Sequence, residues 1–85
     1  MRRHIKHEAE SDLGPGVVYI EFTDDEPTRQ VEVYGEVWLW GDSKHFEYLA
    51  DRCYGELGLS EELDIPQAEF ERVWEEALRR CPRSS

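Results

Sequence analysis

Two tyrosine–glutamate pairs are the residues whose types and spacing could do chemistry. Tyr19 stands two positions before Glu21, and Glu32 stands two positions before Tyr34. Side chains two apart on a strand share a face, so all four could gather on one sheet surface. Two carboxylates can act as acid and base, but no second catalytic element accompanies them, which favours a binding surface over an active site. The predicted binding residues are Tyr19, Glu21, Glu32, Tyr34, Val37 and Leu39.

A pair of histidines near the start of the chain forms the one cluster of metal-ligand type. It consists of His4, His7 and Glu8. On a strand, His4 and His7 point to opposite faces and cannot hold one ion together, although His4 and Glu8 could share a face. We therefore predict no metal site, no cofactor and no catalytic residue.

The cysteines do not match a reactive or metal-binding motif. Cys53 and Cys81 are too far apart in sequence for a metal knuckle, and a disulfide between them stays open. Cysteine nucleophiles need a base within hydrogen-bond reach, and His45 lies eight residues before Cys53. We interpret Cys53 as a structural thiol. The chain also has no P-loop, no Gly-rich dinucleotide motif and no serine nucleophile elbow.

The stretch RQVEVYGEVWLW, residues 29–40, predicts the β-hairpin that would position this surface. Gly35-Glu36 fits a two-residue type II′ turn, because the first turn position needs φ > 0. That loop pairs Tyr34 with Val37 and gathers an apolar core face of Val31, Val33, Trp38 and Trp40. A three-residue loop would instead shift the register by one, put Trp38 beside Glu32 and expose both indoles as a binding face.

Two strands and two turns are expected before the hairpin. Met1–Ser11 has a weak alternating pattern typical of an edge strand, and Val17–Thr23 is the second strand. The turns are Asp12–Gly16 and the acidic Asp24–Thr28, whose Pro27 should stop strand pairing. The apolar side chains of the second strand should join the core face of the hairpin, which would unite Val18, Ile20 and Phe22 with Val31 and Val33.

Pro66–Arg80 is the clearest helix. Its apolar residues recur at i, i+3, i+4, i+7 and i+8, and they are Phe70, Val73, Trp74, Ala77 and Leu78. This stripe should cover the apolar sheet face with Trp74 at its centre. Between hairpin and helix, residues 44–52 fit either a short helix or an extended segment, and residues 55–64 read as loop.

The predicted fold is therefore α+β: an antiparallel meander sheet of three to four strands with a C-terminal amphipathic helix packed on one face. We expect a single domain over residues 1–85, with residues 1–3 and 82–85 frayed at the ends.

The charge balance narrows the classes of partner. Twenty acidic residues against ten basic ones give a net charge of -10, which repels nucleic-acid phosphates and suits a basic protein surface. No secretory signal peptide and no membrane-spanning run is visible, so we expect a cytoplasmic protein with no membrane or nucleic-acid partner.

The order of short motifs resembles an uncharacterised family of small bacterial domains, a domain-of-unknown-function group. The motifs are Ile5-Lys6, Tyr19–Phe22, Arg29–Tyr34 and Phe70–Glu75. The sequence departs from that family at the hairpin turn, where its members have a longer Asp/Gly-rich loop, and around Cys53. The resemblance implies a bacterial or phage origin and an α+β fold, and it supplies no activity.

Three functional hypotheses follow. The first is a small, acidic, non-enzymatic protein-interaction module that docks on a basic partner, most concretely an immunity-type protein covering the cationic active site of a toxin. The second is a small enzyme or ligand-binding domain that uses the Tyr/Glu face of the sheet. The third is a structural subunit that forms a homodimer through an edge strand or that same face.

Overall fold

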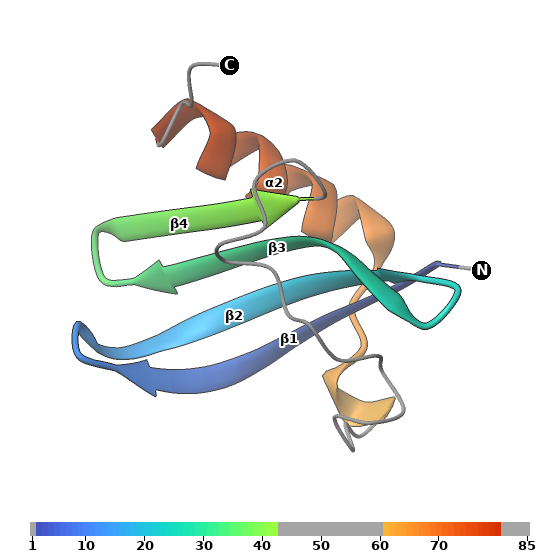
Figure 1. Cartoon of the computed structure of the whole chain (residues 1–85), viewed down its shortest axis with the longest axis horizontal. Helices are drawn as coiled ribbons and strands as arrows, with labels where there is room; N and C mark the ends of the chain where they lie inside the picture. The colour runs from blue at the N-terminus through green and yellow to red at the C-terminus, as the bar shows by residue number, and fades with distance from the viewer. Residues whose placement is uncertain (1, 43–60, 81–85) are drawn as a thin grey trace.

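Four antiparallel strands, one 3-10 turn and one long helix make up the part of the chain that the computed structural model describes, residues 2–42 and 61–80. The strands are β1 (Arg2–Ser11), β2 (Gly14–Thr23), β3 (Glu26–Tyr34) and β4 (Val37–Asp42), and they lie in the order β1-β2-β3-β4. The 3-10 turn η2 (Glu61–Leu63) and the helix α2 (Gln67–Arg80) follow (Figure 1). The predicted α+β meander with a C-terminal helix is confirmed.

Some predictions fall on other residues. The alternatives for residues 44–52, the Cys53–Cys81 pairing, the His45–Cys53 relation and the fraying of residues 82–85 lie outside the described part of the chain. At the other end, Arg2 and Arg3 belong to β1 and pair with Thr23 and Phe22.

The β3–β4 hairpin has the register predicted from its loop length. Tyr34 pairs with Val37, and Val31 pairs with Trp40. Gly35 has a φ of 64°, while Glu36 is not among the residues with positive φ, as a type II′ turn requires. The three-residue alternative, which would have exposed both indoles beside Glu32, is therefore excluded.

The turn between β2 and β3 is shorter than predicted. Only Asp24 and Asp25 leave the strands, with φ values of 49° and 76°, and β3 resumes at Glu26. The prediction that Pro27 stops strand pairing is wrong, because Pro27 lies inside β3 opposite Phe22. Proline is tolerated there since the ladder is interrupted by a bulge next to it.

That bulge decides which side chains share a face. Phe22 pairs with Pro27, but the preceding residue, Glu21, pairs with Arg29, so Thr28 is the extra residue on β3. A one-residue slip reverses the facing of every later side chain. Val18 therefore lies opposite Glu32, and not on the face of Val31 as predicted.

Two separate apolar clusters result, one on each side of the sheet. On one side are Ile5, Val18, Ile20 and Phe22, packed with Ala9 and Leu63. On the other are Val31, Trp40 and Ala77, packed with Tyr19, Val33, Trp38, Val73 and Trp74. The prediction that Val18, Ile20 and Phe22 join Val31 and Val33 is thus wrong.

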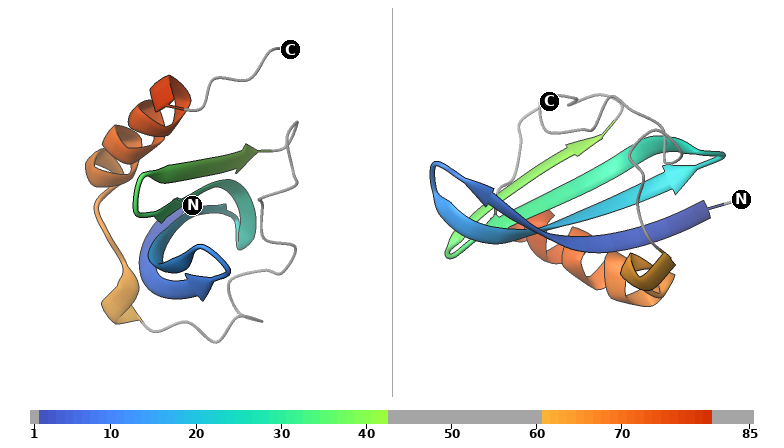
Figure 2. Two further views of the ribbon diagram at one scale, coloured as in Figure 1. Left: turned by 90° about the vertical axis from the view of Figure 1, so that its left-hand side faces the viewer. Right: turned by 90° about the horizontal axis from the view of Figure 1, so that it is seen from below.

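Helix α2 covers the face that carries Val31 and Trp40, as predicted, and Figure 2 shows it lying across one side of the curled sheet. The helix begins one residue after the predicted start, and the backbone carbonyl of Pro66 accepts from the amides of Glu69 and Phe70. Trp74 meets Trp40 edge-on, with ring centroids 5.3 Å apart. Within the described residues, no helix is both long and apolar enough to cross a membrane.

Candidate functional site

A buried ionic network lies between the sheet and α2, centred on Glu21. Neighbouring positions of β1, β2 and β3 bring together His4, Glu21 and Arg29, since His4 pairs with Glu21 and Glu21 pairs with Arg29. His4 Nε2 lies 3.0 Å from Glu21 Oε2, and Arg29 Nε donates to Glu21 Oε1 at 2.8 Å. The bulge residue Thr28 donates its hydroxyl to the same Oε1 at 2.8 Å. One extra residue in β3 therefore gives Glu21 two donors from adjacent positions.

Helix α2 adds a second carboxylate, Glu71, to the network. Arg29 Nη1 donates to Glu71 Oε1 at 3.0 Å, and Arg29 Nη2 donates to Glu71 Oε2 at 2.6 Å. The guanidinium carbon also lies 5.1 Å from the Phe70 ring centroid and 5.2 Å from that of Trp74. Guanidinium groups stack well on aromatic faces while they pair with carboxylates. Arg29 thus ties the helix to the sheet.

Pairing outweighs burial in setting the charge of Glu21. Burial alone would raise the pKa of this carboxyl, but hydrogen bonds from Arg29, Thr28 and His4 and the charge of Arg29 lower it to about 2. The hydrogen bonds from Arg29 also lower the pKa of Glu71. A carboxylate that holds its charge so firmly is a poor general acid or base near neutral pH. The network links the sheet to α2.

The same cluster has the spacing of a metal site. His4, Glu21 and Glu71 each offer a ligand atom, and these atoms lie within 4.8 Å of one another. Arg29, however, donates to both carboxylates and already supplies the positive charge between them. A metal ion would have to displace a paired guanidinium, which the chemistry of the donor set opposes.

The residues predicted to form one binding surface lie on two faces. Tyr19 and Glu21 share the helix side with Val31, because Tyr19 pairs with Val31. Glu32 pairs with Leu39 and Tyr34 pairs with Val37, which keeps these four together on the opposite side. Glu21 and Glu32 therefore cannot act as an acid–base pair on one substrate.

On that opposite side, Glu32 is occupied by its neighbours. The Tyr34 hydroxyl donates to Glu32 Oε1 at 2.7 Å, and Gln30 Nε2 donates to Glu32 Oε2 at 3.2 Å. The hydrogen bond to Glu32 and burial together raise the pKa of Tyr34 to about 12. The Tyr34 ring packs over Gly16, where an added Cβ would lie 2.3 Å from Cδ1 of the ring. Tyr34 is thus a core residue.

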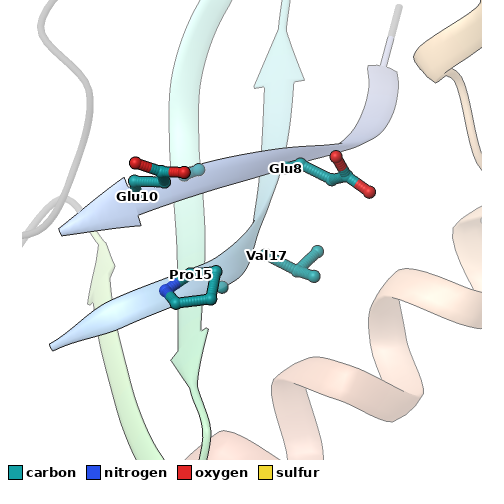
Figure 3. A pocket seen from close by; sticks show the side chains of 6 residues that line it. Glu8, Glu10, Pro15 and Val17 are labelled. Carbon is teal, nitrogen blue, oxygen red and sulfur yellow. The ribbon is translucent and has the colours of Figure 1, made fainter.

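An open hollow lies at the end of the β1–β2 hairpin (Figure 3). Its volume is about 620 Å³, and the residues that line it are Glu8, Ala9, Glu10, Pro15, Gly16 and Val17. Glu8 and Glu10 alternate along β1, so their side chains stand on the same face, with Val17 and Pro15 beside them on β2. The hollow combines two carboxylates with an apolar wall.

No cation of residues 2–42 or 61–80 neutralises these two glutamates. Four arginines pair elsewhere: Arg29 with Glu21 and Glu71, Arg79 and Arg80 with Glu76, and Arg3 with Asp64. Lys6 stands on the same face as Glu8, but its Nζ lies over the Tyr19 ring, 5.7 Å from the centroid. Both carboxylates are exposed.

Neither the ionic network around Glu21 nor the hollow beside Glu8 and Glu10 is signalled directly by the sequence. From the sequence, Glu8 is a possible metal ligand beside His4, and Arg29 is the first residue of the predicted hairpin. The bulge at Thr28 determines which side chains of β2 and β3 point to the same face of the sheet. The alternation of apolar and polar residues in the sequence does not reveal that bulge. Pro15 and Gly16 line the hollow and belong to β2, although the sequence predicts a turn over residues 12–16.

Comparison of the chain with protein-family models finds no match, and comparison with curated proteins finds none either.

Proposed function

We propose that this protein is a small, acidic, non-enzymatic interaction module that docks on a basic partner through the Glu8/Glu10 hollow. The observation that carries the proposal is the state of those two carboxylates: exposed, on one face, without an ion-pair partner in the described residues, and next to apolar surface. A lysine or arginine side chain could place its charge at the carboxylates and its aliphatic stem against Val17 and Pro15.

The electrostatics of the whole chain support the same partner. A net charge of -10 favours approach of a cationic surface and raises the association rate at low salt. Exposed pairs are screened over about 8 Å at physiological ionic strength, so such docking is salt-sensitive. The most specific form of this proposal is an immunity-type protein that covers the cationic active site of a toxin.

A catalytic role has less support. Glu21 and Glu32 stand on opposite faces, and the pKa of Glu21 is lowered rather than raised. An acid–base enzyme at this site would need two carboxylates on one face with pKa values pushed apart toward neutrality.

A capture experiment from lysate of the source organism, at about 50 mM and 500 mM salt, tests the proposal. The immobilised proteins are the wild type, E8Q/E10Q, and the control E36Q/E75Q, which removes two exposed carboxylates elsewhere. We expect one basic protein retained stoichiometrically at low salt by the wild type and the control, and lost with E8Q/E10Q. Recovery of no stoichiometric partner at either salt would contradict the proposal, as would equal recovery with E8Q/E10Q.

A further inference from the structure

Among residues 2–42 and 61–80, one half of the outer edge of β1 has a backbone partner and the other half has none. In the described part of the chain, β1 is the end strand of the sheet, and β2 is the strand that pairs with it along its length. Near its start, Ile5 forms an antiparallel bridge with Asp64, and the amide of Ile65 donates to the carbonyl of His4 at 2.8 Å. This edge therefore already accepts one extended antiparallel segment from the chain itself.

The direction of that bond fixes which backbone groups face outward. In an antiparallel strand, alternate residues point their N–H and C=O groups to the same side. Because the carbonyl of His4 points outward, the backbone groups of Lys6, Glu8 and Glu10 point outward as well. Among the described residues, no backbone hydrogen bond from another element reaches Glu8 or Glu10.

The side chains of these residues stand beside the hollow. Glu8 and Glu10 therefore direct their backbone groups to the side of this edge and their carboxylates over the hollow. The carbonyl of Glu8 lies 2.9 Å from Nδ1 of His7, a side-chain contact that an added strand would replace. Glu8 and Glu10 are about 7 Å apart along the strand, the spacing of alternate residues on any strand laid beside them. In an antiparallel pair, residues opposite each other point to the same face.

We propose that the basic partner docks by adding an extended antiparallel strand to β1 along Lys6–Ser11, with lysine or arginine at alternate positions facing Glu8 and Glu10. This inference rests on the proposed function and specifies its geometry. Main-chain bonds to the edge would supply affinity, and the charged side chains would set the register.

Charge argues against a second copy of this chain as the occupant. Each copy carries a net charge of -10. The other edge strand, β4, contains no lysine or arginine, and the open part of β1 contains only Lys6. A strand with alternating cations complements the glutamates, whereas like charges placed opposite each other destabilise a pair.

The test uses three synthetic peptides with the full-length protein in calorimetric titrations at low salt. The parent peptide alternates lysine and valine over ten residues. The second peptide carries a methyl group on the backbone nitrogen of every lysine, and the third carries one on the backbone nitrogen of every valine. With lysines opposite Glu8 and Glu10, the lysine amides face β1 and the valine amides face away. We expect lysine methylation to weaken binding at least about tenfold, and valine methylation to change it less than about threefold.

Variants of Glu8 check the same geometry from the protein side. Glu8→Pro removes an outward amide and leaves the bonds to β2, because proline is tolerated where its nitrogen faces away from the sheet. Glu8→Gln removes the charge but keeps the amide. We expect E8P to bind the parent peptide several-fold more weakly than E8Q, with unchanged far-UV circular dichroism confirming that both are folded.

Each outcome decides the matter. Equal binding of all three peptides would overturn strand addition while leaving charge-driven docking, and hence the proposed function, intact. Failure of the parent peptide to bind would also overturn strand addition, and the lysate capture would then judge the proposed function separately. A dimer in light scattering that E8P converts to monomer would identify a second copy as the occupant and overturn the inference.

Discussion

Two groups of carboxylates in this molecule have opposite surroundings. Glu21, 4% exposed, lies on β2 among hydrogen-bond donors, and it contacts β1 through His4 and is linked to β3 and α2 through Arg29. Glu8 and Glu10 are exposed beside an apolar wall and have no cation of their own in the described residues. The same residue type is thus buried and ion-paired in one place and exposed in the other. Burial and pairing, not residue type, separate the two roles.

Removing the cation of the buried group should give the largest effect. Arg29→Met leaves Glu21 and Glu71 without their shared partner, and breaking a buried ion pair from one side costs about 3–5 kcal/mol. Urea unfolding followed by tryptophan fluorescence measures this loss. Arg79→Met is the control, because the Arg79 side chain is 74% exposed and its surface pair contributes less than about 1 kcal/mol. Equal losses for the two variants would refute the distinction between buried and surface pairs.

The second largest effect should come from acid, which removes the stabilisation supplied by the buried Glu21 carboxylate. The pKa of Glu21 is lowered from 4.5 to about 2 in the folded protein, so its ionised form is favoured by folding. The ionised carboxylate of Glu21 therefore stabilises the folded state fully above pH 4.5, the pKa of the unfolded chain. This stabilisation is lost as the pH falls from 4.5 to about 2, a loss on the order of 3 kcal/mol.

The measurement is the difference in unfolding free energy between the wild type and Glu21→Gln from pH 7 to pH 2.5. This difference cancels the effect of protonating the other carboxylates. It should shrink steadily below about pH 4.5. A difference that stays constant across the range would show that Glu21 has an ordinary pKa.

A third substitution tests the packing of Tyr34 against Gly16, which also lines the hollow. At Gly16, an added Cβ would lie 2.3 Å from the backbone oxygen of Val33 and from the ring of Tyr34. Gly16→Ala should therefore destabilise the protein by about 1–3 kcal/mol through overpacking, measured by urea unfolding. Pro15→Ala, at the exposed neighbouring position, is the control and should change stability far less. An unchanged midpoint for Gly16→Ala would mean that Tyr34 packs elsewhere.

The sequence predicted what depends on local periodicity. The two-residue loop at Gly35 determined the register of β3 and β4, and the spacing of Phe70, Trp74 and Ala77 determined which side of α2 meets the sheet. These are short-range relations, in which neighbours along the chain determine the geometry.

The sequence could not predict which residues of β2 and β3 share a face, because that depends on one inserted residue. Thr28 forms a bulge, and the slip it introduces separates Tyr19 and Glu21 from Glu32 and Tyr34. The ionic network joins residues from four elements, so it emerges only when that register is known. Two apolar faces in place of one follow from the same slip.

The double variant E8Q/E10Q tests the central claim most directly when unfolding and binding are measured on the same protein. If the exposed glutamates serve a partner and the buried one serves the fold, its unfolding free energy should stay within about 0.5 kcal/mol of the wild type. Its affinity for the alternating lysine–valine peptide at low salt should fall about tenfold or more. An affinity equal to that of the wild type, or a stability loss comparable to that of Arg29→Met, would contradict the account.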